Sequence, residues 1–515
     1  MSSLATLPIE VRELIVQLLD KKALFSCVRV SRTFLVFFLP FLWQYVRISV
    51  SPKRALPSQG YAALAAHASL VTDLVLVGSL PEEYYSISFP HLKTLKIETS
   101  YSSDPQDLTL LHVALVRANP TVQDLTLHIT SSKPTNEFWE VIETEWIRPR
   151  SLNIVFPIVE PGESTAFWRA CSRFETLTIN NDDIPFISRG FNNNTITFQQ
   201  QQQQPRPPID AFPHIERLTL KFDPTGYGGG PDHVDWIRRC PRLVYLAWNL
   251  VGRWSPVERL VAELKNTTWP NLSSLRLEQS MHTDKDFSDL VTSLPHLRSL
   301  ELAQSTFGPL SFAALVTHPQ IRNLHTFSVL SCNGFTGAMA QAVLEQCSTL
   351  NTFAAPYISV HDVAHEDSRP WACVHSIRYL AIYITCGSPS TIESRQKLFD
   401  QLGLLSHLIH LDLGAHRLSQ LPVQIRTQFI THESTLSLKL SSDNGGLANF
   451  AGLTQLRHFS FQQTPQSLGM TEVQWVLEHW TNLGKIVGQF TNTDIPFSRL
   501  FDLFQQNGIA YNEVA

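Results

Sequence analysis

The chain has 515 residues, which is enough for two to four ordinary domains or for one long array of repeats. Hydrophobic residues make up 43% and charged residues 17%, which is the composition of a folded rather than a disordered protein. The formal net charge of −5, together with the lack of any basic run, argues against nucleic acid as a ligand.

The apolar stretches and the cysteines indicate neither a membrane segment nor an oxidising environment. The most apolar stretch, Phe34–Trp43, is interrupted by Pro40 and falls well short of the roughly 20 apolar residues that cross a bilayer. The first residues lack the basic-then-apolar order of a signal peptide. The seven cysteines are dispersed and do not have the spacing of a zinc site or a disulfide framework. We therefore expect no membrane association and a reducing location, cytoplasmic, nuclear or both.

Three short helices are predicted in the first fifty residues. Thr6 is expected to cap the first helix, with Pro8 in its first turn. A second helix fits residues 22–28, and a third fits residues 32–38 and is expected to end at Pro40. Domains this small bury little surface alone, so leftover apolar surface should be covered by a partner, by the next domain or by both. The first helix carries one apolar stripe at helical spacing: Val11, Leu14, Ile15, Leu18 and Leu19.

The same segment resembles the F-box motif from residue 7 to residue 43. The resemblance rests on Leu7-Pro8-x-Glu10-Val11, Leu18-Leu19, Leu24, Cys27, Val30-Ser31, Phe34 and Pro40-x-Leu42-Trp43. It implies docking on a small Skp-type adaptor, which joins F-box proteins to a cullin-RING ubiquitin ligase. The open alternative is a helical cap that only shields the first strand of the next domain. The adaptor contacts that the resemblance implies are Leu7, Pro8, Ile9, Leu14, Val30 and Trp43.

From Val71 onward one strand pattern recurs: an apolar residue, two others, an apolar residue, one other and an apolar residue. It appears as Leu272/Leu275/Leu277 and again as Leu297/Leu300/Leu302, and a degraded last copy is Leu483/Ile486/Val487. Successive copies are spaced within the range of leucine-rich repeats. A proline precedes many of the strands, as in Trp269-Pro270-Asn271-Leu272, and ends the helix of the preceding unit.

Between the strands the apolar period changes from two to about 3.6, so each unit is a strand, a turn and a helix. Stacked units share a continuous core, since one unit cannot bury its own apolar face. We predict an α/β fold: a leucine-rich-repeat solenoid over residues 51–515, with a parallel concave sheet and convex helices, after a three-helix F-box over residues 1–50. An Asn/Gln/Pro-rich insertion at about residues 188–210 is predicted to be a disordered loop.

The sequence contains no constellation with the spacing of a known catalytic or metal site. His361 and His365 lie near Asp362 and Glu366, but they lack the glutamate position of a zinc-binding HExxH helix. Gly226–Gly230 is glycine-rich without the frame of a phosphate loop. We therefore expect no enzyme activity, no cofactor and no metal.

Together these features predict the substrate-recognition subunit of an SCF-type ubiquitin ligase. The F-box would bind the Skp-type adaptor, the repeats would bind a protein substrate, and the rate gain would come from proximity rather than from side-chain chemistry. The alternative is a leucine-rich-repeat interaction scaffold without a ligase role. A scaffold would stand alone, whereas a receptor should purify with the adaptor.

The target is predicted to bind the concave face of the sheet. Residues that flank the buried anchors of each strand alternate onto that face. Most of these flanking residues are small or neutral, so a local mix of Arg, Glu and Tyr is typical of a recognition surface. The predicted substrate contacts are Arg217, Lys221, Tyr245, Arg276, Glu278, Glu301, Tyr379 and Tyr383.

Overall fold

A computed structural model gives the fold, and the chain divides into two units, Met1–Leu243 (unit 1) and Val244–Ala515 (unit 2), which are described separately. The predicted insertion at about residues 188–210 lies outside the described residues. The structure describes residues 7–49, 58–99, 107–129, 134–155, 164–180, 212–222, 237–250, 269–278, 283–317, 321–364, 369–386, 392–414, 438, 440, 446–490 and 497–512, except 79, 333 and 467.

Unit 1 begins with three helices, α1 (Ile9–Gln17), α2 (Lys21–Cys27) and α3 (Arg32–Gln44), as the sequence predicts. Two of them start at side-chain caps, which satisfy amide groups that a helix start leaves unpaired. The Asp20 carboxylate accepts the Ala23 N–H at 2.7 Å, and the Ser31 hydroxyl accepts the Phe34 N–H at 3.2 Å.

Two predicted helix boundaries are wrong. The N-cap of α1 is Pro8, which makes no side-chain cap, while Thr6 lies outside the described residues. Helix α3 does not stop at Pro40 but continues through it to Gln44. Pro40 cannot donate to the carbonyl of Val36, and both residues are exposed, so water can hydrate that carbonyl.

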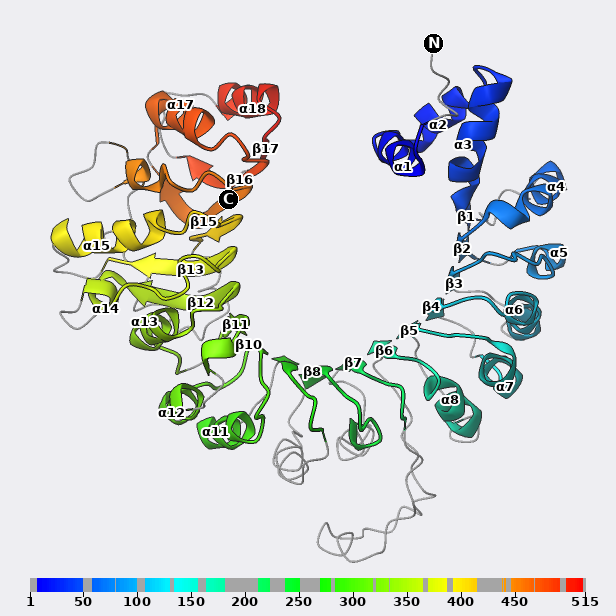
Figure 1. The fold of residues 1–515 in the computed structure, drawn as a ribbon, viewed down its shortest axis with the longest axis horizontal. Coiled ribbons are helices and arrows are strands. Elements are labelled where there is room, and N and C mark those ends of the chain that lie inside the picture. The colour runs from blue at the N-terminus through cyan, green and yellow to red at the C-terminus, as the bar shows by residue number, and fades with distance from the viewer. Residues whose placement is uncertain are drawn as a thin grey trace, which may run out of the picture. The chain divides into compact units, whose positions relative to one another are not determined.

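Unit 1 continues as a parallel sheet in which each described strand pairs with the next one along the chain. The sheet begins directly after α3, before the predicted boundary at residue 50. Figure 1 shows the helices of this unit on one side of its strands. The strands are β1 (Tyr45–Ser49), β2 (Asp73–Val77), β3 (Thr94–Thr99), β4 (Asp124–Ile129), β5 (Ser151–Val155), β6 (Thr176–Asn180) and β7 (Arg217–Phe222). The helices are α4 (Ser58–Ala66), the 3-10 helix η2 (Ala68–Leu70), α5 (Glu82–Tyr85), α6 (Asp107–Ala118), α7 (Asn136–Glu145) and α8 (Ser164–Cys171).

Unit 2 repeats this plan, again with consecutive parallel strands. Its strands are β8 (Tyr245–Leu250), β9 (Ser274–Glu278), β10 (Ser299–Ala303), β11 (Thr326–Ser328), β12 (Thr352–Ser359), β13 (Tyr379–Thr385), β14 (His410–Asp412), β15 (His458–Gln466), β16 (Lys485–Phe490) and β17 (Ala510–Asn512). Its helices are α11 (Asp284–Thr292), α12 (Pro309–Thr317), η5 (Ile321–Asn323), α13 (Gly337–Gln346), α14 (Val360–Ala364), α15 (Ile392–Gly403), η8 (Leu447–Phe450), α17 (Met470–His479) and α18 (Phe497–Gln506).

The repeated apolar anchors form the core. Leu275, Leu300 and Phe327 stand in register on β9, β10 and β11, and each is at most 1% exposed. The turn before each strand also points inward: the Leu272 N–H donates to the Trp269 carbonyl at 3.2 Å across Pro270, and both Leu272 and Trp269 are buried. The chain therefore has the predicted α/β leucine-rich-repeat fold.

The last predicted repeat has a different third anchor from the one expected. Val487 pairs with Ser460, whereas Gly488 takes the position of the anchor, in register with Phe461. A Cβ at Gly488 would clash with the Phe461 ring, so the aromatic ring fills the space that a side chain would need. The assignment of Val487 as an anchor is wrong, because an apolar pattern does not show that a glycine stands in for an apolar residue.

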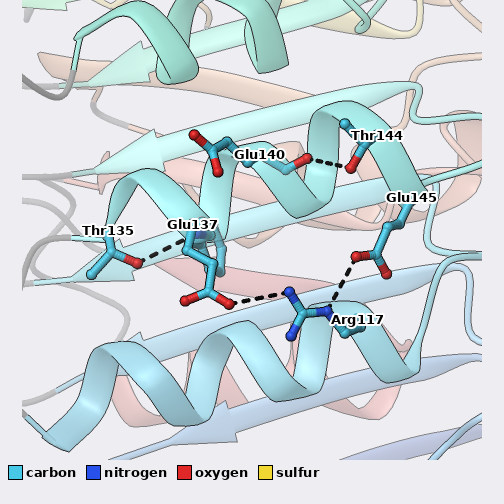
Figure 2. Close-up of polar contacts among 7 residues, drawn as sticks. Arg117, Thr135, Glu137, Glu140, Thr144 and Glu145 are labelled. Atoms are coloured by element: carbon cyan, nitrogen blue, oxygen red, sulfur yellow. Dashed lines mark hydrogen bonds and ion pairs between the residues drawn. The ribbon is translucent and has the colours of Figure 1, made fainter.

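The helical side of unit 1 is held by exposed polar contacts. Arg117 of α6 forms ion pairs with Glu137 and Glu145 of α7, each at 3.1 Å, as Figure 2 shows. The Thr135 hydroxyl caps α7 by accepting the Phe138 N–H at 3.4 Å. All three charged side chains are 39–49% exposed, so water screens these ion pairs and they add little to stability. This side of the unit has the character of a solvated structural surface.

Candidate protein-interaction surfaces

The three N-terminal helices have a small core of their own. Leu24 of α2 and Phe37 and Phe38 of α3 are at most 6% exposed, with the two phenylalanine rings edge to face at 4.5 Å. Half-buried apolar residues complete the core, and these are Ile15, Val16, Leu19, Cys27, Val28, Phe34 and Leu42. Sequence spacing predicted one stripe on α1, but only Ile15 and Leu19 of that stripe pack inward.

The other half of the α1 stripe faces outward. Val11, Leu14 and Leu18 are 38, 60 and 86% exposed, and similar side chains on α2, α3 and the turn between them are also exposed. Burying a side chain of this size stabilises a structure by about 1.5–3 kcal/mol, and apolar surface gathered in one short segment marks an interaction site. We call this set the outward apolar surface: Val11, Leu14, Leu18, Phe25, Val30 and Val36.

The six residues predicted to contact an adaptor differ in their surroundings. Pro8, Leu14 and Val30 are exposed, and Leu7 is half-buried. The side chain of Ile9 lies outside the described residues. Trp43 is half-buried, with its ring 4.7 Å from that of His67. Trp43 therefore belongs to the join between the helices and the repeats, and contact of these six residues with an adaptor stays a prediction.

The join itself is tight. The carbonyl of Gln44, the last residue of α3, accepts two hydrogen bonds from Thr72. One comes from the Thr72 N–H at 3.0 Å and the other from the Thr72 hydroxyl at 3.3 Å. Tyr45, the next residue, already pairs with Asp73 of β2, and Ile48 of β1 is buried. The helices thus cover the start of the sheet, as the cap alternative also requires, but this covering leaves the outward apolar surface unused.

In unit 2, three of the predicted substrate contacts come together on the sheet face that points away from the helices, which we call the open face. Arg276 of β9 donates its Nε–H to Glu278 at 2.7 Å, and its guanidinium lies 3.7 Å from Glu301 of β10. The side chains of Arg276, Glu278 and Glu301 are 46, 22 and 34% exposed. We call these residues the charged triad, and it carries one net negative charge.

The triad is held together by charge. Partial burial acts to lower the pKa of Arg276, but its hydrogen bond to Glu278 and the negative charges of Glu278 and Glu301 raise it above its ordinary value. Tyr245 of β8 is half-buried and close enough to contribute to this shift. Arg276 is therefore already paired within the sheet, and a target would meet the carboxylates as much as the guanidinium.

The remaining predicted substrate contacts differ in how exposed their side chains are. Arg217 and Lys221 on β7 of unit 1 are exposed, and Tyr379 on β13 is half-buried on the open face of unit 2. Tyr383 is only 3% exposed, so its assignment to an exposed recognition surface is wrong. It pairs with Tyr357 beside an irregularity of β12, and β13 is buried from Leu380 to Thr385. Strand alternation predicts which face a residue occupies but not how far its neighbours cover that face.

Two open-face histidines were not among the predicted contacts. The Tyr379 ring stacks on His410 of β14 at 4.3 Å, and His410 lies 4.1 Å from His458 of β15. Lys485 of β16 is the next residue in this row, in register with His458. We call Tyr379, His410 and His458 the ring ladder. The sequence signal was available, because each of these residues directly precedes the middle anchor of its own repeat.

The electrostatics around His458 favour its neutral imidazole. Burial lowers the pKa of His458, the charge of Lys485 lowers it further, and Asp412 acts in the opposite direction. Asp412 itself is 4% exposed, and its carboxylate accepts the Gly414 N–H at 3.0 Å. This row therefore offers partly accessible aromatic and imidazole rings beside the side chain of Lys485.

The described residues include no group of three or more His, Cys, Asp or Glu placed to hold a metal ion. Asp362 accepts the Ser359 N–H at 2.9 Å, whereas His365 and Glu366 lie outside the described residues. Burial raises the pKa of Cys332 and Cys347 to about 12, so these thiols stay protonated. Within the part of the chain that the structure describes, no helix has the length and apolar character of a membrane span.

The fold defines the chain as a leucine-rich-repeat protein of the α/β class. Among solved structures, it is similar to a chain in the crystal structure of the Rad7 and Elc1 complex in yeast. The two chains share 13% sequence identity over 99% of this chain and 98% of that chain, with a TM-score of 0.44. No family model matches the sequence, and no curated protein matches it.

Proposed function

We propose that this protein is the substrate receptor of an SCF-type ubiquitin ligase. Its N-terminal helices would bind a Skp-type adaptor, and the open face of its repeats would bind a protein target. The observation that carries the proposal is the outward apolar surface, which includes Leu14, Leu18 and Val30, at 60, 86 and 66% exposure. Such surface at the start of a folded chain calls for a partner.

The residues that make the sequence resemble an F-box support the identity of this partner. Leu24, Phe34 and Leu42 belong to the core of the three helices, while Leu18 and Val30 remain outside it. The motif therefore serves two purposes, because some of its apolar residues fold the segment and others stay accessible. A cap needs only the first group.

The proposed role in ubiquitination is to hold a target near an enzyme. Tethering two reactants raises the effective concentration of one at the other to the millimolar range for short connections. The described side chains would supply binding and position, and the transfer of ubiquitin would be carried out by the ligase and its conjugating enzyme. The scaffold without a ligase role is the second candidate, favoured by the contact of Trp43 with His67.

The test is capture of a purified Skp-type adaptor by the full-length chain, measured by titration calorimetry. Leu14→Ser removes an apolar group of the outward apolar surface, and Leu110→Ser on α6 is a matched control at 65% exposure. We expect Leu14→Ser to weaken adaptor binding at least tenfold, on the basis of about 1.5–3 kcal/mol per buried side chain, and Leu110→Ser to leave it unchanged.

Equal binding by the parent, Leu14→Ser and Leu110→Ser would remove the basis of the adaptor assignment. No binding by the folded parent chain would favour the scaffold. Thermal unfolding of each variant provides the control for folding, and both positions are exposed, so we expect changes within about 0.5 kcal/mol.

A further inference from the structure

The open face of unit 2 is polar at two places and neutral between them. At β9 and β10 lies the charged triad of Arg276, Glu278 and Glu301, with one net negative charge. At β14 to β16 lie His410, His458 and Lys485, with imidazole and ammonium groups at the surface. The two places lie on the same sheet, because the strands from β10 to β15 pair one after another.

Between these places the open face carries no charged side chain on the described parts of β11, β12 and β13. On the described parts of β11 and β12 it presents short side chains: Thr326 and Ser328 on β11 pair with Thr352 and Ala354 on β12. Thr326, Ser328 and Thr352 are half-buried, while Ala354 lies beneath at 3% exposure. Along the row of Thr326 and Thr352, a chain could cross these strands without meeting a large or charged side chain before Tyr379, which is in register with Thr352.

Each of these two polar places favours a ligand group of complementary charge. The net negative triad favours a lysine or arginine, because the side chains of Glu301 and Glu278 stay partly exposed beside Arg276. The other end presents the Lys485 ammonium and the ring N–H groups of His410 and His458, which favour an anion. Asp412, the carboxylate at this end, is 4% exposed and accepts the Gly414 N–H, and its charge offsets part of the attraction of these donors for an anion.

We propose that the open face of unit 2 binds an extended target segment that carries a basic residue at one end and an anionic residue at the other. This inference rests on the proposed function, in which the repeats bind a protein target, and it names the class of that target. The anionic group is an acidic side chain or a phosphorylated one, since both offer oxygens to imidazole and ammonium donors.

The strand spacing sets the separation of the two groups. Five strand steps lead from β10, which carries Glu301, to β15, which carries His458. At about 4.8 Å per step this is roughly 24 Å, and an extended chain covers it in about seven residues at about 3.3 Å per residue. A segment with its basic and anionic residues much closer together cannot reach both ends.

The experiment is a selection of displayed random 12-residue peptides on the immobilised full-length chain. We expect the enriched peptides to carry Lys or Arg and Asp or Glu about six to eight positions apart. Synthetic peptides that follow this pattern, with Asp or with phosphoserine at the anionic position, are then measured by fluorescence anisotropy. Tighter binding of the phosphoserine peptide would assign the anion to a modified residue, and equal binding would assign it to an acidic one.

Matched variants locate the two contacts. Glu301→Gln and Lys485→Gln are each expected to weaken the selected peptide at least fivefold, whereas Glu393→Gln and Lys397→Gln on α15 are expected to leave its affinity unchanged. Binding of a peptide with Glu in place of its basic residue should be restored by Glu301→Lys. Each variant is compared with the parent by thermal unfolding, so that a loss of folding is not counted as a loss of contact.

Three results would overturn the inference: enriched peptides without this spacing, no enrichment at all, or equal binding by Glu301→Gln, Lys485→Gln and the parent. Concentration-dependent self-association that Glu301→Lys abolishes would assign the face to a second copy of the chain instead. The ligase role is tested separately through Leu14→Ser and the adaptor. Failure of adaptor binding with intact peptide selection would reject the ligase role and keep the peptide site.

Discussion

Asp284 is the clearest single side chain that connects one repeat of unit 2 to the next. It is the first residue of α11, and its carboxylate accepts the N–H groups of Gly308, Leu310 and Ser311 at 2.8, 2.8 and 3.0 Å. It also accepts the Ser311 hydroxyl at 2.6 Å. One carboxylate thus satisfies amide groups at the start of α12 that the helix cannot pair itself.

We expect Asp284→Ala to destabilise the protein by about 2–3 kcal/mol. Loss of an ordinary helix cap costs about 0.5–2 kcal/mol, and hydrogen bonds to a charged group contribute about 1.5–3 kcal/mol. The total stays well below the sum over four bonds because Asp284 is only half-buried and water can replace part of the contact. Urea unfolding followed by circular dichroism measures the difference.

Two neighbours provide graded controls. Lys285→Ala changes an exposed residue of the same helix and should alter the free energy of unfolding by less than about 0.5 kcal/mol. Asp286→Ala removes the capping box of α11, in which Asp286 accepts the Thr283 N–H at 2.9 Å, and should cost about 1 kcal/mol. If Asp284→Ala is no more destabilising than Lys285→Ala, the link between repeats contributes nothing and the reasoning fails.

Acid titration gives a second measurement of the same contact. Partial burial acts to raise the pKa of Asp284, but the hydrogen bonds from Ser311, Leu310 and Gly308 outweigh it and hold the pKa below its ordinary value. The stabilisation is therefore complete above about pH 4, the ordinary value for Asp, and is lost as the pH falls through the lowered pKa. We expect the difference between the parent and Asp284→Ala to shrink as the pH is lowered from 5 to 2.

Three further predictions follow from described contacts. Because the folded protein holds the pKa of His458 below the ordinary histidine value of about 6.5, the free energy of unfolding is highest above that pH and falls as the ring is protonated. In urea unfolding, His458→Gln should therefore lose less stability than the parent between pH 7 and pH 5. Gly488→Ala should cost about 1–3 kcal/mol by overpacking against Phe461, whereas Gly484→Ala, whose nearest neighbour lies at 3.7 Å, should have little effect; equal thermal shifts of the two would contradict this. Deleting residues 191–208 should shift the unfolding temperature by only a few degrees, because β6 and β7 pair directly on either side and loop length costs only about 0.6 kcal/mol per doubling; aggregation of the deletion variant would show that the segment supports the core.

The fold was predictable because its signal is repeated. Leu275, Leu300 and Phe327 have the same place in successive units, so any single ambiguous strand is interpreted from its neighbours. Errors arose where one local contact outweighed the pattern. Gly488 replaces an anchor because Phe461 fills its place, and α3 continues through Pro40 with the free carbonyl of Val36 at an exposed position.

The candidate site was less predictable, because sequence alternation shows a residue's face but not its surroundings. Arg276, Glu278 and Glu301 were expected as separate contacts, and their mutual pairing depends on the register of β9 and β10. Tyr383 was expected to be exposed, but its neighbours bury it. His410 and His458 could have been found by aligning the residue before each middle anchor, because stacking between strands requires aromatic rings at the same position.

The direct passage from Gln44 at the end of α3 to Tyr45 at the start of β1 affects how a bound enzyme would approach a target. A flexible tether lets a captured protein sample many orientations, so almost any lysine on it can be modified. Here no spacer residue lies between the helices and the first strand, and Thr72 holds the junction at the Gln44 carbonyl. An adaptor on these helices would share one orientation with the first repeats. For a target bound to those first repeats of unit 1, the choice among its lysines would then depend on geometry rather than on chemical reactivity.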